Sequence, residues 1–140
     1  MQAYKDGVKK FDNGEYELAI KGLEKAAAEN YEPNQTNFLI AESYRLSNRF
    51  KESIPFYKKA LDGGLTNPEA QFQYAYALKT VGQYEEASNQ FSLFAKNTAS
   101  PKNLQDRALR EIEVIRIADR LRTQKMEVEI KNIPLNSTGS

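Results

Sequence analysis

The chain has 140 residues, enough for one domain with a modest core, and 40% of them are hydrophobic while 28% are charged. Its 20 Lys and Arg residues almost balance its 19 Asp and Glu residues, so no nucleic-acid partner is expected, because nucleic-acid binders carry a basic excess. Histidine and cysteine are absent, which excludes disulfides, cysteine nucleophiles, histidine acid–base catalysis and the usual zinc sites.

The sequence predicts neither an enzyme nor a bound cofactor or metal. Its acidic pairs, such as Glu85 with Glu86, stand beside Lys and Arg on predicted helix faces, where carboxylates are usually solvated ion pairs rather than acid–base catalysts. No apolar run approaches the ~18 residues of a membrane span. Residues 1–20 lack a basic segment followed by an apolar stretch, so no signal peptide is expected within them.

A repeat organises residues 1–100. Gly14, Asn48 and Gly82 are each 34 residues apart, and five further positions repeat with the same step. Those positions are Gly7, Ala41 and Ala75; Tyr16, Phe50 and Tyr84; Ala19, Ser53 and Ala87; Leu23, Tyr57 and Phe91; and Ala26, Ala60 and Phe94. Three copies in one register predict repeats at about 1–33, 34–67 and 68–100.

Each repeat is predicted to be a pair of amphipathic helices joined by a tight turn. Gly14, Asn48 and Gly82 mark the turn, because Gly and Asn accept the left-handed backbone of a helix end. The aromatic residue two positions later is expected to open the second helix. Asn67 followed by Pro68 marks the start of the third repeat, with a capping side chain before a proline at the first helical position.

These positions resemble the tetratricopeptide repeat family. The family pattern is small–x–x–large, then Gly–x–aromatic, then Ala, a large residue and Ala at fixed offsets, and residues 3 to about 100 follow it. Two residues depart from it: Phe94 stands where a small residue is usual, and Lys10 where a large apolar one is usual. The resemblance implies an all-α fold, a superhelix of three helix-turn-helix repeats.

Residues 101–124 are predicted to form one further helix that completes a domain spanning 1–124. Apolar residues follow one face of it: Leu104, Ala108, Ile112, Ile115, Ala118 and Leu121. Charged residues follow the other: Arg107, Arg110, Glu111, Arg116, Asp119, Arg120 and Arg122. Since stacked repeats leave an apolar end exposed, we expect this helix to cap that end with its charged face outward. The alternative is half of a further repeat-like interface for a partner.

The pattern changes in residues 125–140, which are predicted to be an extended tail. Met126, Val128 and Ile130 alternate with charged residues, a two-residue period that suggests a short strand. Residues 133–140 then have the composition of a linker. A lone strand is unstable, so the tail is expected to begin a following β domain or to dock elsewhere.

Short tetratricopeptide repeats followed by the segment MEVEIKNIPLNSTGS are similar to a family of bacterial outer-membrane lipoproteins. Members carry a β-propeller after the repeats and then an OmpA-like peptidoglycan-binding domain; the best-known one belongs to the type IX (Por) secretion system. The resemblance implies a periplasmic, outer-membrane-associated protein whose partners are other secretion-system subunits. Membrane attachment would then depend on a lipid anchor outside this chain, and peptidoglycan binding on another domain.

The tetratricopeptide resemblance also implies a binding site, because first helices line the concave face of such a stack. By register with the family, nine residues face it: Tyr4, Val8, Phe11, Phe38, Glu42, Arg45, Phe72, Tyr76 and Lys79. Aromatic side chains with a few cations suit an extended peptide or a docked helix. The alternative is that Tyr4, Phe38 and Phe72 simply pack between repeats.

One subtype of the family, which clamps a C-terminal carboxylate with Lys, Asn and Arg, is not matched. The corresponding positions hold Tyr4, Val8, Leu39, Glu69 and Gln73, so a free-carboxylate ligand is not expected. We therefore predict a scaffold that binds a protein or peptide through the concave face. The alternative is a structural spacer whose groove is filled by its own tail or by a neighbouring domain.

Overall fold

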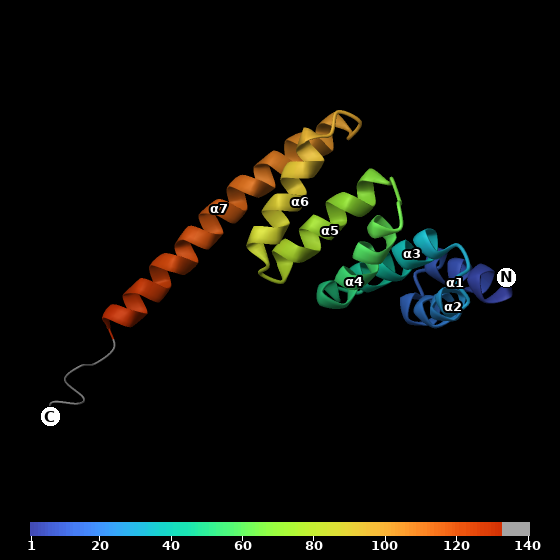
Figure 1. Cartoon of the computed structure of the whole chain (residues 1–140). Helices are drawn as coiled ribbons and strands as arrows, with labels where there is room; N and C mark the ends of the chain where they lie inside the picture. Colours follow the sequence, from blue (N-terminus) through green and yellow to red (C-terminus); the bar gives the residue numbers. More distant parts are fainter. Residues whose placement is uncertain (133–140) are drawn as a thin grey trace, which may run out of the picture.

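A computed structural model describes residues 1–132, which form seven α-helices and no strand (Figure 1). The helices are α1 Gln2–Asp12, α2 Tyr16–Ala28, α3 Pro33–Leu46, α4 Phe50–Asp62, α5 Pro68–Thr80, α6 Tyr84–Lys96 and α7 Lys102–Lys131. Each helix packs against the next one along the chain, so α1–α2, α3–α4 and α5–α6 are three successive hairpins and α7 covers α6. The predicted all-α superhelix is confirmed. Within residues 1–132, no helix is long and apolar enough to cross a membrane.

The three hairpin turns have the predicted left-handed backbone. The φ angles are +77° at Gly14, +61° at Asn48 and +86° at Gly82. Each second helix then begins at the predicted aromatic residue: Tyr16, Phe50 or Tyr84. The turn works because Gly, and to a lesser extent Asn, tolerates a positive φ that a bulky side chain resists.

Small residues let the paired helices approach closely. A Cβ atom on Gly7 would lie 2.8 Å from the Leu23 Cγ atom, so only glycine fits between α1 and α2 at this point. Ala41 and Ala75 occupy the same repeat position and are fully buried. Ser53, in the second small position, is also fully buried, and its hydroxyl donates a hydrogen bond to the Phe50 carbonyl at 2.6 Å.

The larger of the two apolar clusters runs from α3 to α7 and is densest where α5, α6 and α7 meet. Phe72 of α5 packs edge-on against Phe91 and Phe94 of α6, with ring centroids 5.4 and 5.7 Å apart. Ala108 and Ile115 of α7 belong to the same cluster. Phe94 stands where the family usually has a small residue, and its ring fills the space between these three helices, where it is fully buried.

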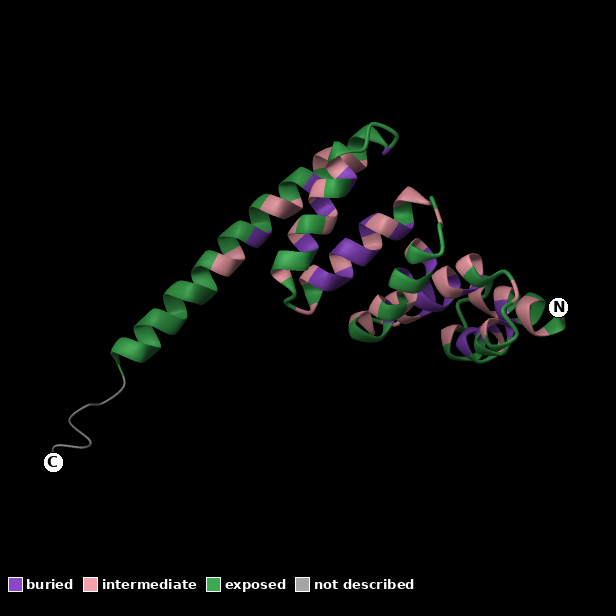
Figure 2. Ribbon diagram, viewed as in Figure 1, coloured by how far each residue is buried: buried purple, intermediate pink, exposed green. Residues whose placement is uncertain are grey.

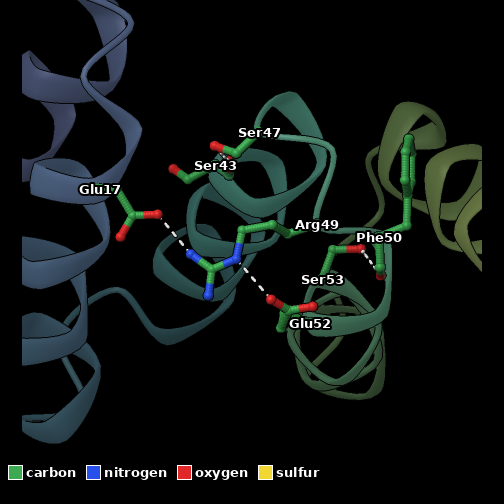
Figure 3. Close-up of polar contacts among 7 residues, drawn as sticks. All are labelled: Glu17, Ser43, Ser47, Arg49, Phe50, Glu52 and Ser53. Carbon is green, nitrogen blue, oxygen red and sulfur yellow. Dashed lines mark hydrogen bonds and ion pairs between the residues drawn. The ribbon is translucent and has the colours of Figure 1, made fainter.

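An arginine between α3 and α4 ties the first two repeats together (Figure 3). The Arg49 guanidinium donates to Glu17 of α2 at 2.6 Å and to Glu52 of α4 at 2.7 Å. Its carbon centre also lies 4.7 Å from the centroid of the Tyr44 ring. These partners come from both repeats, so the contact adds a polar link between them.

The prediction of a strand in the tail is wrong, because α7 continues without a break to Lys131 (Figure 1). Met126, Val128 and Ile130 are all helical and exposed. A lone strand would leave its backbone groups without partners, whereas a helix pairs them internally. No Gly or Pro occurs between residues 102 and 132 to end it. The predicted linker, residues 133–140, lies outside the described part of the chain.

The repeat step explains why α7 does not turn back. The position 34 residues after Gly82 holds Arg116, which is not suited to the left-handed turn. The predicted cap of 101–124 is therefore a helix of 30 residues, and its second half extends beyond the packed hairpins as a lone, exposed helix (Figure 2).

Candidate functional site

The first helices of the repeats share one side of the molecule. α1 contacts α3, and α5 contacts α7, so first helices lie beside one another at both ends of the stack. We call this surface the inner face and define it by the nine predicted residues. In stacked repeats of this kind the corresponding surface is concave and binds partners. The structure places these residues in four environments.

The residues from α1 are half-buried. The Tyr4 ring lies 5.2 Å from the Tyr31 ring, and the Phe11 ring lies 5.7 Å from the Tyr16 ring, measured between centroids. Val8 packs beside them on the smaller apolar cluster. These side chains therefore contribute to the core and still present part of their surface to solvent.

The centre of the inner face holds a buried ion pair. Glu42 is only 5% exposed, and one of its carboxylate oxygens accepts a hydrogen bond from Arg45 Nε at 2.6 Å and lies 2.5 Å from Arg45 Nη2 in a salt bridge. Burial raises the pKa of Glu42 above its ordinary value, and the Arg45 charge opposes that rise. The hydroxyl of Tyr57 is fully buried and has no hydrogen-bond partner among the described residues. Phe38 packs next to it, with ring centroids 6.4 Å apart.

Phe72 does not belong to the exposed part of the inner face. It is 1% exposed because α6 and α7 cover it, so the prediction that it faces a partner is wrong. It packs in the core, as the alternative had it, but its ring contacts are with Phe91 and Phe94 of its own repeat and with Arg107 of α7. Tyr4 and Phe38 combine the two roles, since each packs on the core and remains partly exposed.

The α5 end of the inner face is built jointly with α7. Lys79 lies over the Tyr76 ring, 5.0 Å from its centroid, and forms a salt bridge with Glu111. The guanidinium carbon of Arg107 lies 4.8 Å from the centroid of the Phe72 ring and 5.8 Å from that of Tyr76. Such contacts stabilise a cation over a ring and fix its position.

Sequence reasoning missed Arg107 and Glu111, which were predicted on an outward charged face. The sequence did contain a signal for this pair: Arg107 and Glu111 are four residues apart, so they share one side of α7. On α5, an aromatic residue and a lysine at similar spacing offer the matching partners. The relative position of the two helices, which decides this pairing, is not visible in either segment alone.

Two cavities lie away from the inner face. The larger, of about 810 Å³, is open to solvent and separates the start of α6 from the middle of α7. Its lining includes Tyr84, Ile112 and Arg122. The guanidinium carbon of Arg122 lies 5.6 Å from the centroid of the Tyr84 ring. A second cavity, of about 390 Å³, lies between the α4–α5 loop and α6. Neither contains a predicted site residue.

Comparisons with known proteins agree with this architecture. The family model described as a tetratricopeptide repeat matches residues 35–62, which include all of α4 and all but the first two residues of α3. A solved structure, the type III secretion translocator chaperone SycD of Yersinia enterocolitica, matches with a TM-score of 0.71 and 19% identity. The match covers 85% of this chain and 84% of that one. No curated protein matches the sequence. Residues 35–62 are therefore a tetratricopeptide repeat, and the chain has the fold of a tetratricopeptide superhelix.

Proposed function

We propose that this protein is an interaction scaffold that binds a segment of another protein on its inner face. The observation that carries the proposal is the row of partly exposed aromatic and aliphatic side chains on successive first helices. Tyr4 and Val8 come from α1, Phe38 from α3 and Tyr76 from α5. Side chains of this kind, already held in place by neighbours, are effective anchors for a partner because little rotamer freedom is lost on binding.

The charges of the inner face define the chemistry of the partner. Arg45 is paired with Glu42, and Lys79 is paired with Glu111, so both cations are neutralised within the chain. Arg107, over the Tyr76 ring, is in no ion pair within residues 1–132, so acidic groups suit this surface better than basic ones. We expect an amphipathic segment, helical or extended, that inserts apolar or aromatic residues between the two ion pairs.

The fold comparison supports the proposal in a general way. SycD is described as a chaperone of a secretion translocator, that is, as a protein that serves another protein. At 19% identity the similarity shows the fold alone, so the extension to this chain rests on its own inner face.

We further propose a periplasmic role as part of a secretion machine tethered to the outer membrane. Its support is the resemblance of the repeats and the following segment to outer-membrane lipoproteins, although the helix of 125–131 removes the strand from that argument. The test is fractionation of the source cells followed by crosslinking. Recovery with the envelope, crosslinked to other secretion subunits, is the expected result, and recovery in the cytosol contradicts it.

The binding proposal is tested by selecting displayed peptides on the wild-type domain. Selected peptides are then measured against a double variant, Val8→Glu with Tyr76→Glu, which places charge on two partly exposed positions of the inner face. A matched control, Leu18→Glu with Leu93→Glu, alters two exposed apolar residues on the second helices α2 and α6.

The expected result is a loss of affinity of at least about tenfold in the inner-face variant and none in the control, with unchanged helical content in both. Equal affinity for all three proteins would falsify the assignment of the inner face. If no peptide binds the wild-type domain, the structural spacer becomes the better description.

A further inference from the structure

The second half of α7 has no cover in the described part of the chain. Every residue from Arg120 to Asn132 is exposed, and the helix extends past the start of α6 (Figures 1 and 2). The exposed residues are not uniformly polar. Leu121 is 57% exposed and Val128 is 55% exposed, values that are high for large apolar side chains in a helix.

These apolar residues form one stripe along α7. Val114, Ile117, Leu121 and Val128 are separated by three, four and seven residues, so they share a face in the a and d positions of a heptad. Gln124 occupies the remaining position between them. Val114 and Ile117 are 46% and 38% exposed. A stripe with this spacing fits another helix running alongside it.

The stripe is distinct from the face that packs on α6. Leu121 and the buried Ile115 are six residues apart, which places them roughly 120° from each other around the helix. Met126 and Ile130 belong instead to the continuation of the buried face. A helix lying on the stripe would therefore not compete with α6.

Charges beside the stripe indicate which helix would fit. Arg120 and Glu127 are seven residues apart on one edge, and Lys125 lies on the other. None of the three forms an ion pair within residues 1–132, whereas Arg116 and Arg122 are paired with Glu113 and Asp119. The edge that carries Arg120 and Glu127 therefore has an unpaired positive charge at one end and an unpaired negative charge at the other.

This arrangement is self-complementary in one direction only. In an antiparallel pair of identical helices, Arg120 of one copy faces Glu127 of the other, and the reverse contact repeats it. In a parallel pair, Arg120 would face Lys125 of the second copy and repel it. Antiparallel pairing also brings Ile117 of each copy close to Val128 of the other.

We propose that two copies of this chain associate through antiparallel pairing of the stripe on α7. The paired segment is residues 114–131. α6 lies against its first part on the face of Ile115, which is turned away from the stripe, and antiparallel pairing places the hairpins of the two copies toward opposite ends of the segment. The dimer carries two inner faces, and a partner with two binding segments gains avidity from it. This inference does not depend on what the inner face binds.

Sedimentation equilibrium on the full chain tests the association. The wild-type chain is expected to form a dimer, and Leu121→Glu to weaken it by at least about tenfold with unchanged helical content. Leu93→Glu, which changes an equally exposed leucine on α6, serves as the control and is expected to leave the dimer intact. A wild-type chain that stays monomeric at its highest soluble concentration overturns the proposal.

Charge exchange tests the direction of pairing. Arg120→Glu and Glu127→Arg are each expected to weaken the dimer about tenfold, because each creates two repulsive contacts. The double variant recreates both attractive contacts with the signs exchanged and is expected to restore wild-type affinity. A double variant weaker than either single one overturns the antiparallel arrangement.

Crosslinking adds an independent readout, since the natural chain contains no cysteine. In the antiparallel pair, the two copies of residue 131 are roughly 25 Å apart, too far for a disulfide. Lys131→Cys is therefore expected to give no covalent dimer. Val114→Cys combined with Lys131→Cys is expected to give one, because residue 131 of each copy lies near residue 114 of the other. The opposite pattern overturns the proposal.

Discussion

The hairpins α1–α6 and the far half of α7 contrast in what determines their structure. In the hairpins, every 34 residues the chain reverses at a left-handed residue, and each helix is buried by the next. In α7 the same position holds Arg116, the chain does not reverse, and the helix continues alone into solvent. The difference teaches that one backbone position per repeat decides between a compact hairpin and a long exposed helix.

The largest expected contrast is in packing. Phe72→Ala removes a ring that is 1% exposed and is expected to lower the free energy of unfolding by about 4 kcal/mol. Ile130→Ala removes a side chain that is 64% exposed and is expected to change it by less than about 0.5 kcal/mol. Urea titration of both variants measures the two values. Similar losses would show that the end of α7 is packed after all.

A smaller effect is expected at the turns. Gly82→Val places a β-branched residue at a φ of +86° and is expected to cost about 2 kcal/mol. Gln83→Val is the matched control, because its backbone φ is −84° and requires no left-handed conformation. Thermal or urea unfolding distinguishes them. If both variants lose the same stability, backbone strain is not what selects glycine at this turn.

The next prediction concerns local opening of α7. Arg116→Gly is expected to speed amide exchange in residues 117–131 about fivefold relative to Arg116→Ala, because glycine is the poorer helix former. The comparison with alanine is needed, since both changes remove the ion pair with Glu113. Exchange in α1–α6 is expected to be unchanged. Exchange that is faster in α1–α6 as well would indicate that the hairpins and α7 open as one unit.

The smallest expected effect is a pair of opposite pH responses. Burial raises the pKa of Glu42, whereas a hydrogen bond from Arg116 lowers the pKa of Glu113 on α7. Carbon-13 titration of the two carboxyl groups is expected to show Glu42 above and Glu113 below the ordinary value of 4.5. Equal values for the two groups would contradict the burial of Glu42.

The sign of each contribution to stability follows from linkage. The native state with a raised pKa binds a proton more readily than the unfolded state, so Glu42 adds stability as the pH falls through its folded pKa toward 4.5. Glu113 has a lowered pKa, so its contribution is present above 4.5 and is lost as the pH falls below that value. Unfolding curves of Glu42→Gln and Glu113→Gln against pH separate the two.

The candidate site was predictable in its outline and not in its detail. Register with the repeats was sufficient to predict that residues of α1, α3 and α5 lie on one side of the molecule. It was not sufficient to show that Phe72 is covered, because that depends on how α7 crosses α5. Glu111 and Arg107 were missed for the same reason: their partners lie on another helix, 32 and 35 residues earlier in the chain.

By itself, the sequence determined the number of hairpins, the turns and the aromatic starts of the second helices. These features depend on local backbone preference and on the periodic spacing of apolar residues, and both can be recognised within a short stretch of sequence. Only the tertiary structure decided the fate of the tail and the composition of the inner face. Alternating apolar residues at 126, 128 and 130 suit a strand only where another strand can pair with them, and a continuous helix satisfies its own backbone without one.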